Sequence, residues 1–371
     1  MYKRLALILT GALILISLTY WLLMQPMSCD AQFSMKSLTI ERVGSGQRTI
    51  VGFQPYLEPA DYACVERFEH KLSAYLDSAR AVGCLPESAI VAFPEYIGTW
   101  LVLLGEPAGC FRAQTLNSAL TWAVLRQPYR FWTFYQKATK EGWGDPAAVA
   151  AFRSKAPQMA EAFHQVFSRL ARSYRVFIVA GSIVLPGAQI INDTLHIDPA
   201  APLENVSLFY YPDGHADPKI VKKAFPIAQE LGFTRPGKVE DLPIYETPLG
   251  RIGVLICADS WFPASYKSMG KVDLLIVPSY LMGDSCWTSP WRGYSGWATP
   301  DDVSRTQITE GEAWLTYAMG GRLPSHNPNA IGMNIFLKGR FWELGADGRA
   351  VFVSDGKVST SEADIICLKL R

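Results

Sequence analysis

The chain has 371 residues, of which 49% are apolar, and its charged side chains nearly cancel to a net charge of +1. A chain of this length and composition can bury a sizeable core in one large domain or two ordinary ones, which argues against a disordered protein. It carries no basic block of the kind that follows a phosphate backbone, so we expect no nucleic-acid partner. The expected partner is a small molecule.

An uncharged apolar run covers residues 5–24, with Lys3 and Arg4 before it and Tyr20 and Trp21 near its end. Its length suits a bilayer-spanning helix, and aromatic side chains favour the membrane interface. The positive-inside rule then places the N-terminus in the cytoplasm. We therefore predict that the rest of the chain lies outside the cytoplasm, in the periplasm if the host is a Gram-negative bacterium.

This interpretation divides the chain into a membrane anchor with a short link over 1–30 and a catalytic domain over 31–371. Two alternatives stay open. A cleaved signal peptide needs a shorter apolar region and small residues before the cut, and the segment LLMQPMSC suits neither need. A lipoprotein signal ending at Cys29 is the other alternative, although Pro26 and Met27 fit it badly.

Some of the seven cysteines can form disulfides at this location, because disulfides form in oxidising compartments. An odd number leaves at least one thiol free in a monomer. Cys64, Cys84 and Cys110 are candidates for a bridge, and the sequence does not choose among them. Cys257 is the expected free thiol.

The elements expected after the anchor alternate between strands and helices, which indicates a layered α/β domain. A strand is expected at 49–57, then an amphipathic helix at 61–83, and then a short strand running into Pro94 and Glu95. Further strands are expected at 174–185, 206–214, 251–259 and 272–280, with a helical pattern at 156–174 before the first of them.

Two stretches rich in aromatic residues stand apart from this pattern. Residues 98–150 mix Trp, Tyr and Phe with Arg and Lys, and they read as helices packed on the core or as a lid or membrane-facing insertion. The second stretch, 286–300, is an aromatic loop that we expect to line the same cleft.

Cys257 ends the apolar run RIGVLIC, which is the position where α/β enzymes place reactive side chains. A cysteine nucleophile works as a thiolate and needs a base, together with a fixed donor for the developing oxyanion. Histidine is the usual base, but none of the five histidines lies at an evident strand end. A papain-like pairing with His326 stays open, although the segment CADSW lacks that family's surroundings.

A carboxylate can replace histidine as the base, and a lysine can supply the donor for the oxyanion. Glu95 follows a strand in VAFPEY, where Pro94 ends the ladder, and Lys223 follows another candidate strand. Glu95 would act as the base, and the lysine cation would lower the thiol pKa and bind the tetrahedral oxygen. Strand alternation cannot decide between Lys222 and Lys223, because a shift of one residue reverses the face.

These residues resemble the motifs of the nitrilase superfamily, the carbon–nitrogen hydrolases. The similarity covers roughly 49–280 and consists of five short patterns in the family's order. They are FPE at 93–95, VAGSIV at 179–184, Lys223 with Pro226 and Glu230, Cys257 with Asp259, Phe262 and Pro263, and DLLIVPSY at 273–280.

The resemblance implies an α-β-β-α sandwich preceded here by one transmembrane helix, and a triad of Glu95, Lys223 and Cys257. It also implies that Glu230 orients the lysine and the base. The backbone N–H of Ala258 is a candidate second oxyanion donor, and Asp259 is the acid of the nucleophile segment. We expect no metal or other cofactor, since the sequence has no ligand spacing and no phosphate loop.

The function implied is hydrolysis of a non-peptide amide or nitrile bond through a cysteine acyl-enzyme. The alternatives are a membrane-associated N-acyltransferase that uses the same thioester, and a catalytically silent binding module. The chain departs from the family in two places. Residues 258 and 260 are small, and the C-terminal region matches only through 339–352. The identity of the substrate and the formation of a homo-oligomer therefore stay undecided.

Overall fold

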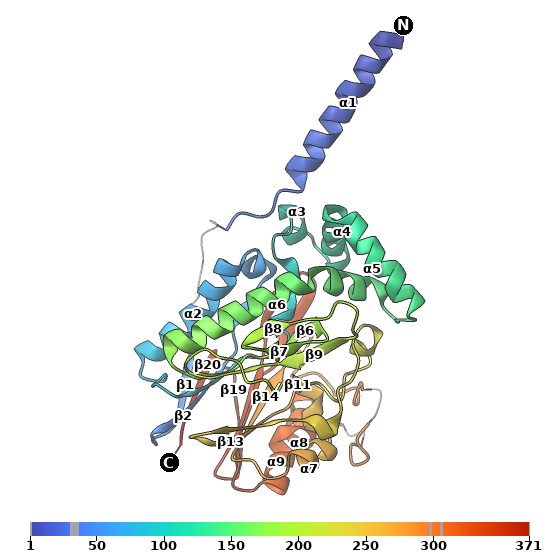
Figure 1. Cartoon of the computed structure of the whole chain (residues 1–371). Coiled ribbons are helices and arrows are strands. Elements are labelled where there is room, and N and C mark those ends of the chain that lie inside the picture. The colour runs from blue at the N-terminus through green and yellow to red at the C-terminus, as the bar shows by residue number, and fades with distance from the viewer. Residues whose placement is uncertain (1, 30–36, 297–298, 305–306, 371) are drawn as a thin grey trace.

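The computed structural model describes residues 2–29, 37–296, 299–304 and 307–370 (Figure 1). Two six-stranded sheets form its centre. The first sheet runs in the order β1 (Ile40–Gly44), β20 (Ile365–Leu370), β2 (Arg48–Phe53), β4 (Ile90–Ala92), β5 (Phe177–Val179) and β10 (Phe209–Tyr210). The second runs in the order β12 (Ile244–Thr247), β13 (Gly250–Val254), β14 (Leu274–Ser279), β15 (Ile331–Phe336), β18 (Ala350–Ser354) and β19 (Lys357–Ser361).

Smaller sheets complete the strand inventory. They are β11 (Val221–Lys222), β9 (Leu203–Ser207) and β6 (Ile183–Pro186); β17 (Leu344–Asp347), β16 (Lys338–Phe341) and β3 (Tyr56–Leu57); and β7 (Gln189–Ile191) with β8 (Thr194–His196). The C-terminal segment expected to match the family thus forms β16, β17 and β18.

The two large sheets pack face to face because their strands are apolar on both sides. In β2, Ile50 joins the core shared by the two sheets, whereas Val51 joins the core beneath the outer helices. A Cβ atom at Gly52 would lie 2.5 Å from the sulfur of Met333 in β15, so this glycine lets the sheets approach closely.

Helices cover both outer faces of the sheet pair. On the first sheet lie α2 (Val65–Ala81) and α6 (Pro146–Tyr174), and on the second lie α7 (Pro263–Met269), α8 (Glu310–Tyr317) and α9 (Met319–His326). In α2, Phe68, Leu72 and Tyr75 recur at helical spacing and are buried in the same core as Phe167 of α6. The expected α-β-β-α sandwich is confirmed.

Several predicted boundaries were wrong. The expected strand at 49–57 is broken between β2 and β3, and the expected strand at 251–259 ends at Val254. Helix α6 begins at Pro146, earlier than expected, because the Asp145 side chain caps it by accepting from the N–H of Ala148 at 2.9 Å.

The aromatic stretch at 98–150 is helical. It forms the 3₁₀ helix η2 (Thr99–Leu103), then α3 (Ala108–Phe111), α4 (Leu116–Arg126) and α5 (Pro128–Lys140), before α6 begins. The remaining 3₁₀ helices are η1 (Pro59–Tyr62), η3 (Glu230–Gly232), η4 (Val239–Asp241) and η5 (Cys257–Trp261).

The apolar N-terminal run forms α1 (Tyr2–Leu23), which projects from the rest of the molecule with none of its residues buried (Figure 1). By length and composition it can cross a membrane, and a signal sequence would have the same properties. Most of the predicted link, residues 30–36, lies outside the described residues.

One of the three candidate cysteines forms a disulfide, but with a partner outside that set. Cys64 is bonded to Cys29, whereas Cys84 and Cys110, the other two candidates, are free thiols buried in the main core. The sequence could not reveal this pairing, because it depends on how the chain returns from α1 to the start of α2. Cys257 is free, as predicted.

Candidate active site

Glu95 is held at the end of β4 by the turn between β5 and β6. Gly181 has a φ of +66°, and a Cβ atom there would lie 2.1 Å from the carbonyl oxygen of Pro94. Only glycine permits this approach. The next residue, Ser182, accepts a hydrogen bond from the backbone N–H of Tyr96 at 2.9 Å. The glycine–serine segment singled out in the sequence therefore positions the turn that carries Glu95.

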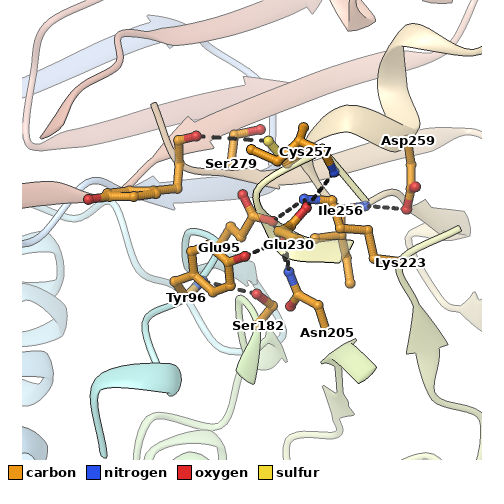
Figure 2. Close-up of polar contacts among 12 residues, drawn as sticks. Glu95, Tyr96, Ser182, Asn205, Lys223, Glu230, Ile256, Cys257, Asp259 and Ser279 are labelled. Carbon is orange, nitrogen blue, oxygen red and sulfur yellow. Dashed lines mark hydrogen bonds and ion pairs between the residues drawn. The ribbon is translucent and has the colours of Figure 1, made fainter. Parts of the chain in front are cut away.

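Lys223 lies between two buried carboxylates (Figure 2). Its Nζ donates to Glu95 Oε1 at 2.8 Å and to Glu230 Oε2 at 2.6 Å, and all three side chains are at most 4% exposed. Asn205 Nδ2 donates to the same two carboxylates, at 3.0 Å and 3.2 Å. The hydroxyl of Tyr96 donates to Glu230. The cluster has several donors to hold two carboxylates that would otherwise repel each other.

Lys222, the alternative lysine, points elsewhere. Its Nζ contacts Glu204 at 2.7 Å and is partly exposed. Successive residues of a strand face opposite sides, so a strand that sends Lys222 to the surface sends Lys223 inward.

Cys257 follows β13 and begins η5, with a φ of +51°. This left-handed conformation is uncommon for a residue with a Cβ and turns the chain sharply out of the strand. Its Sγ lies 3.9 Å from the carbonyl oxygen of Tyr280, which follows β14. The thiol and the Glu95 carboxylate are close enough to shift each other's pKa.

Asp259 connects the cysteine turn to the lysine segment. Its Oδ1 accepts from the backbone N–H groups of Ala224 at 2.9 Å and Phe225 at 2.7 Å, and its Oδ2 accepts from Ile256 at 3.2 Å. Burial raises the pKa of Asp259 to about 7, against the opposing charge of Lys223 and these backbone donors. The acid of the nucleophile segment thus serves to place Lys223 beside Cys257.

The N–H of Ala258 lies in the first turn of η5, where backbone donors have no partner within the helix. Such a donor next to the thiol is where a developing oxyanion would be held.

The protonation states follow from burial and from the neighbouring charges. Burial raises the pKa of Cys257 well above its usual range, and the charge of Glu95 adds to this effect. Burial also raises the pKa of Glu95, although Lys223 opposes it. For Lys223, burial lowers the pKa, but Glu230 and Glu95 together raise it well above its usual range. At neutral pH the resting site therefore holds a charged lysine and a neutral thiol.

Histidine has no part in the described cluster. His326, the papain-like alternative, hydrogen-bonds the carbonyl oxygen of Arg322 and packs on the ring of Tyr266. Among the described residues, metal-ligand types come together at Cys29, Cys64 and Glu66, where the disulfide uses both sulfurs.

Sequence reasoning missed three residues of this site. Asn205 is a polar side chain within the buried strand β9, and that contrast was the available signal. Tyr96 directly follows Glu95 in the quoted motif. Tyr294 belongs to the aromatic loop at 286–300, of which 297–298 lie outside the described residues.

Tyr294 packs edge-on against Phe262, with ring centroids 5.6 Å apart, and also contacts Trp261. Its buried hydroxyl has no hydrogen-bond partner among the described residues, and burial raises its pKa well above the usual range, opposed by the charge of Lys223. A buried hydroxyl without a partner beside a reactive cluster is available to a ligand.

A family model described as carbon-nitrogen hydrolase matches residues 65–297, which is more than half of the chain. A search of curated proteins finds no match.

The fold is similar to solved structures of an amidase from Nesterenkonia sp. AN1. One is a glutamate-to-glutamine mutant with acrylamide added at its active-site cysteine. It is 12% identical to this chain, with a TM-score of 0.52, and the similarity covers 88% of this chain and 94% of the amidase. Another has its cysteine replaced by alanine; its TM-score is 0.51 at 13% identity, covering 88% and 92%. At such identities the similarity shows the fold alone. The family model and the nitrilase fold agree, and the chain belongs to the carbon-nitrogen hydrolase family.

Proposed function

We propose that this enzyme hydrolyses the carbon–nitrogen bond of an amide or nitrile through a thioester on Cys257. Glu95 takes the thiol proton as sulfur attacks the carbon, and Lys223 with the N–H of Ala258 stabilises the charge that develops on the amide oxygen or the nitrile nitrogen. A nitrile first gives a thioimidate, which adds water and loses ammonia to reach the same thioester. For an amide, Glu95 then gives this proton to the departing amine, the carbon–nitrogen bond breaks, and a thioester remains. Water attacks the thioester with Glu95 again as base, which yields a carboxylic acid and restores the thiol.

The observation that carries this proposal is the position of Lys223. Its ammonium contacts Glu95 at 2.8 Å and Glu230 at 2.6 Å in a fully buried site that also contains the Cys257 thiol. A buried charge is expensive unless it is paired, and a lysine held by two carboxylates stays protonated. The positive charge is therefore already in place when an oxyanion forms, so little reorganisation is needed during the reaction.

The neutral resting thiol is consistent with this chemistry. Because Glu95 and Cys257 exchange a proton only when a substrate carbon is attacked, the enzyme does not need a preformed thiolate. Glu230 and Asn205 would act as positioning residues, since they form hydrogen bonds to Lys223, to Glu95 and to each other.

The expected substrate has an apolar portion. Trp261, Phe262 and Tyr294 form an aromatic group beside the nucleophile turn, and the Tyr294 hydroxyl can donate to a polar atom of the substrate.

We also propose that α1 anchors the enzyme in a membrane and that the catalytic domain lies outside the cytoplasm. The disulfide between Cys29 and Cys64 supports this location, because such bonds persist in oxidising compartments. Its use of the Cys29 sulfur argues against lipidation at that residue. Lys3 and Arg4 at the start of α1 support a cytoplasmic N-terminus.

The test is to incubate the full-length protein in detergent with a panel of amides, nitriles and short-chain phospholipids, and to look by peptide mass spectrometry for an acyl adduct on Cys257. Cys257→Ala and Lys223→Ala variants serve as controls. An adduct that decays in water to free acid supports the hydrolase. An adduct that persists until an amine is added supports the N-acyltransferase, the alternative that α1 favours. If no adduct forms and Cys257 also reacts slowly with iodoacetamide, both enzymatic functions are contradicted, and the protein is a binding module.

A further inference from the structure

Helices α4 and α5 form a hairpin, residues 116–140, that carries an unusual set of surface side chains. It includes three of the large apolar side chains exposed outside α1: Leu125 at 46%, Tyr129 at 88% and Trp132 at 56%. It also carries four basic residues, Arg126, Arg130, Lys137 and Lys140, and no acidic one. A chain with an overall charge of +1 thus concentrates both aromatic rings and positive charge on this hairpin.

The hairpin is attached to the end of α1. The hydroxyl of Tyr20, in the last turns of α1, donates to the carbonyl oxygen of Leu125 at 2.6 Å, and the guanidinium of Arg126 donates to the carbonyl oxygen of Met24. Figure 1 shows α3 and α4 beside this end of α1. The end of α4 therefore lies level with the last turn of the apolar helix.

Further contacts fix the chain that follows α1. The N–H of Met27 donates to the carbonyl oxygen of Glu106 at 3.0 Å, and the Cys29–Cys64 disulfide joins the link to the start of α2. The catalytic domain is thus held against the end of α1 at several points, rather than carried on a free tether. An orientation of α1 in a bilayer would therefore also set the orientation of the hairpin.

The hairpin is only partly covered by the rest of the chain. Within α4 and α5, Ala119 and Ala138 are the buried residues among those the structure describes. A cavity of about 50 Å³ lies behind α4, with apolar walls that include Leu116, Leu120 and Val124. Packing against the core accounts for only part of the apolar surface of the hairpin.

We propose that the α4–α5 hairpin is a second membrane contact, which lies on the surface of an anionic bilayer at the level where α1 leaves it. Aromatic rings such as those of Tyr129 and Trp132 favour the interface, and Arg130 and Lys140 meet the lipid phosphates, since Arg126 binds Met24 and Lys137 lies 3.8 Å from Glu141. The inference rests on the proposed anchoring by α1 and goes beyond it, because an anchor alone would leave the hairpin in water.

The contact would place the candidate active site near the bilayer. After α5, the N–H of Asp145 donates to the carbonyl oxygen of Gly232 at 2.8 Å, and Gly232 ends η3, which begins at Glu230. Phe152 of α6 stacks on Phe233 with ring centroids 5.7 Å apart. An amphipathic amide dissolved in the bilayer surface is the class of substrate that such a position favours.

The test places the photoreactive residue p-benzoylphenylalanine at single positions of the full-length chain in lipid nanodiscs, with or without phosphatidylglycerol in phosphatidylcholine. The positions are Tyr129 and Trp132 in the hairpin, Leu13 in α1, and Val358. Val358 is a matched control because it is exposed, at 41%, and lies against Gly320 of α9. Figure 1 shows α9 at the end of the molecule away from α1. Lipid adducts are counted by mass spectrometry after irradiation.

We expect adducts at Leu13 and, several-fold above Val358, at Tyr129 and Trp132. In discs with phosphatidylglycerol, the double variant Arg130→Gln/Lys140→Gln is expected to lower the hairpin yield while leaving the Leu13 yield unchanged. If adducts form at Leu13 but the yields at Tyr129 and Trp132 are no higher than the yield at Val358, the inference is overturned, whereas the proposed anchoring by α1 is supported. Failure at Leu13 as well would instead contradict the anchor.

Discussion

Among the described residues, a glutamate, a lysine and a cysteine lie together in two buried groups, which differ in the backbone around the cysteine and in the partners of the lysine. One is the candidate active site. The other lies behind the α4–α5 hairpin, where Lys155 Nζ contacts Glu106 Oε1 at 2.5 Å, and Cys110 is buried nearby. Burial and the charge of Glu106 raise the pKa of Cys110 to about 12.

The backbone explains the difference between the two groups. Cys110 lies within the short helix α3, and its N–H is bonded to the carbonyl oxygen of Pro107 at 2.9 Å. Cys257 instead begins a helix at a strand end with a φ of +51°, so its own N–H and that of Ala258 fall in the first turn, where a helix offers them no backbone partner. The backbone at the cysteine therefore separates the two groups, whereas enclosed space does not, because Glu106, Cys110 and Lys155 line the cavity of about 50 Å³ behind α4.

The surroundings of the lysine also differ. Lys223 is shared by two carboxylates, and Asn205 bridges both. Lys155 binds one carboxylate and the carbonyl oxygen of Leu104 at 2.7 Å, and the second oxygen of Glu106 has no hydrogen-bond partner in the part of the chain that the structure describes. The Lys155 group therefore resembles an ion pair that joins α6 to the segment below the hairpin.

Replacing each cysteine gives the largest expected contrast. Cys257→Ala should lower kcat/KM by about 10⁴-fold or more, because the nucleophile itself is lost. Cys110→Ala should leave kcat/KM unchanged and lower the free energy of unfolding by about 1 kcal/mol through lost packing. Release of ammonia from the best amide and thermal unfolding measure the two effects. Equal loss of activity in both folded variants would remove the distinction.

Replacing each lysine compares their effects on kcat, because both variants leave buried carboxylates without a cation and are expected to lose stability. Lys223→Met should lower kcat by about 10²–10³-fold, as expected when one oxyanion donor is removed. Lys155→Met should leave Glu106 buried without its partner and cost about 3–5 kcal/mol of stability. The activity per folded molecule of the Lys155 variant should stay at the wild-type level when urea unfolding and kcat are measured together. A low kcat in that variant at full folding would contradict the structural role of Lys155.

The pH profile of kcat/KM tests Glu95 as the base. Glu95 works only when deprotonated, and burial raises its pKa above the ordinary 4.5, so activity should rise with pH along a limb whose midpoint lies above pH 4.5. Asn205→Ala removes a donor that favours the charged carboxylates, which should move this limb to higher pH. A limb that does not move in the Asn205 variant would show that another group sets it.

The smallest expected effect concerns the aromatic loop. Tyr294→Phe removes only a buried hydroxyl that has no partner in the described chain, so stability should be unchanged or slightly higher. If the hydroxyl donates to the substrate, kcat/KM should fall about fivefold, mainly through KM. Trp291→Phe, in the same loop, is the matched control for a general change in packing. Identical kinetics of the Tyr294 variant and the wild type would exclude the hydroxyl as a substrate contact.

Much of the fold was predictable from the sequence. The apolar strands, the helix after residue 61 and the order of the short motifs led to the sandwich, because strand and helix patterns depend on neighbours along the chain. The expectation that Glu95, Lys223 and Cys257 meet at strand ends agrees with their positions in the structure. Their catalytic roles remain predictions.

Other features depended on how distant segments pack. The choice between Lys222 and Lys223 needed the pairing of β11 with β9, because a shift of one residue reverses the face of a strand. Asn205 gave no local signal of its contacts with Glu95 and Glu230. The Cys29–Cys64 pairing required the path of the chain between α1 and α2.

By itself, the sequence therefore determined the types of element, their order and the residues that end the strands, since these follow from local periodicity and from breakers such as proline and glycine. The tertiary structure alone decided which of two Glu–Lys–Cys groups has a free backbone donor, which lysine points inward and which cysteines bond. These depend on contacts between segments far apart in the chain, where a small change in register or packing alters which side chains meet.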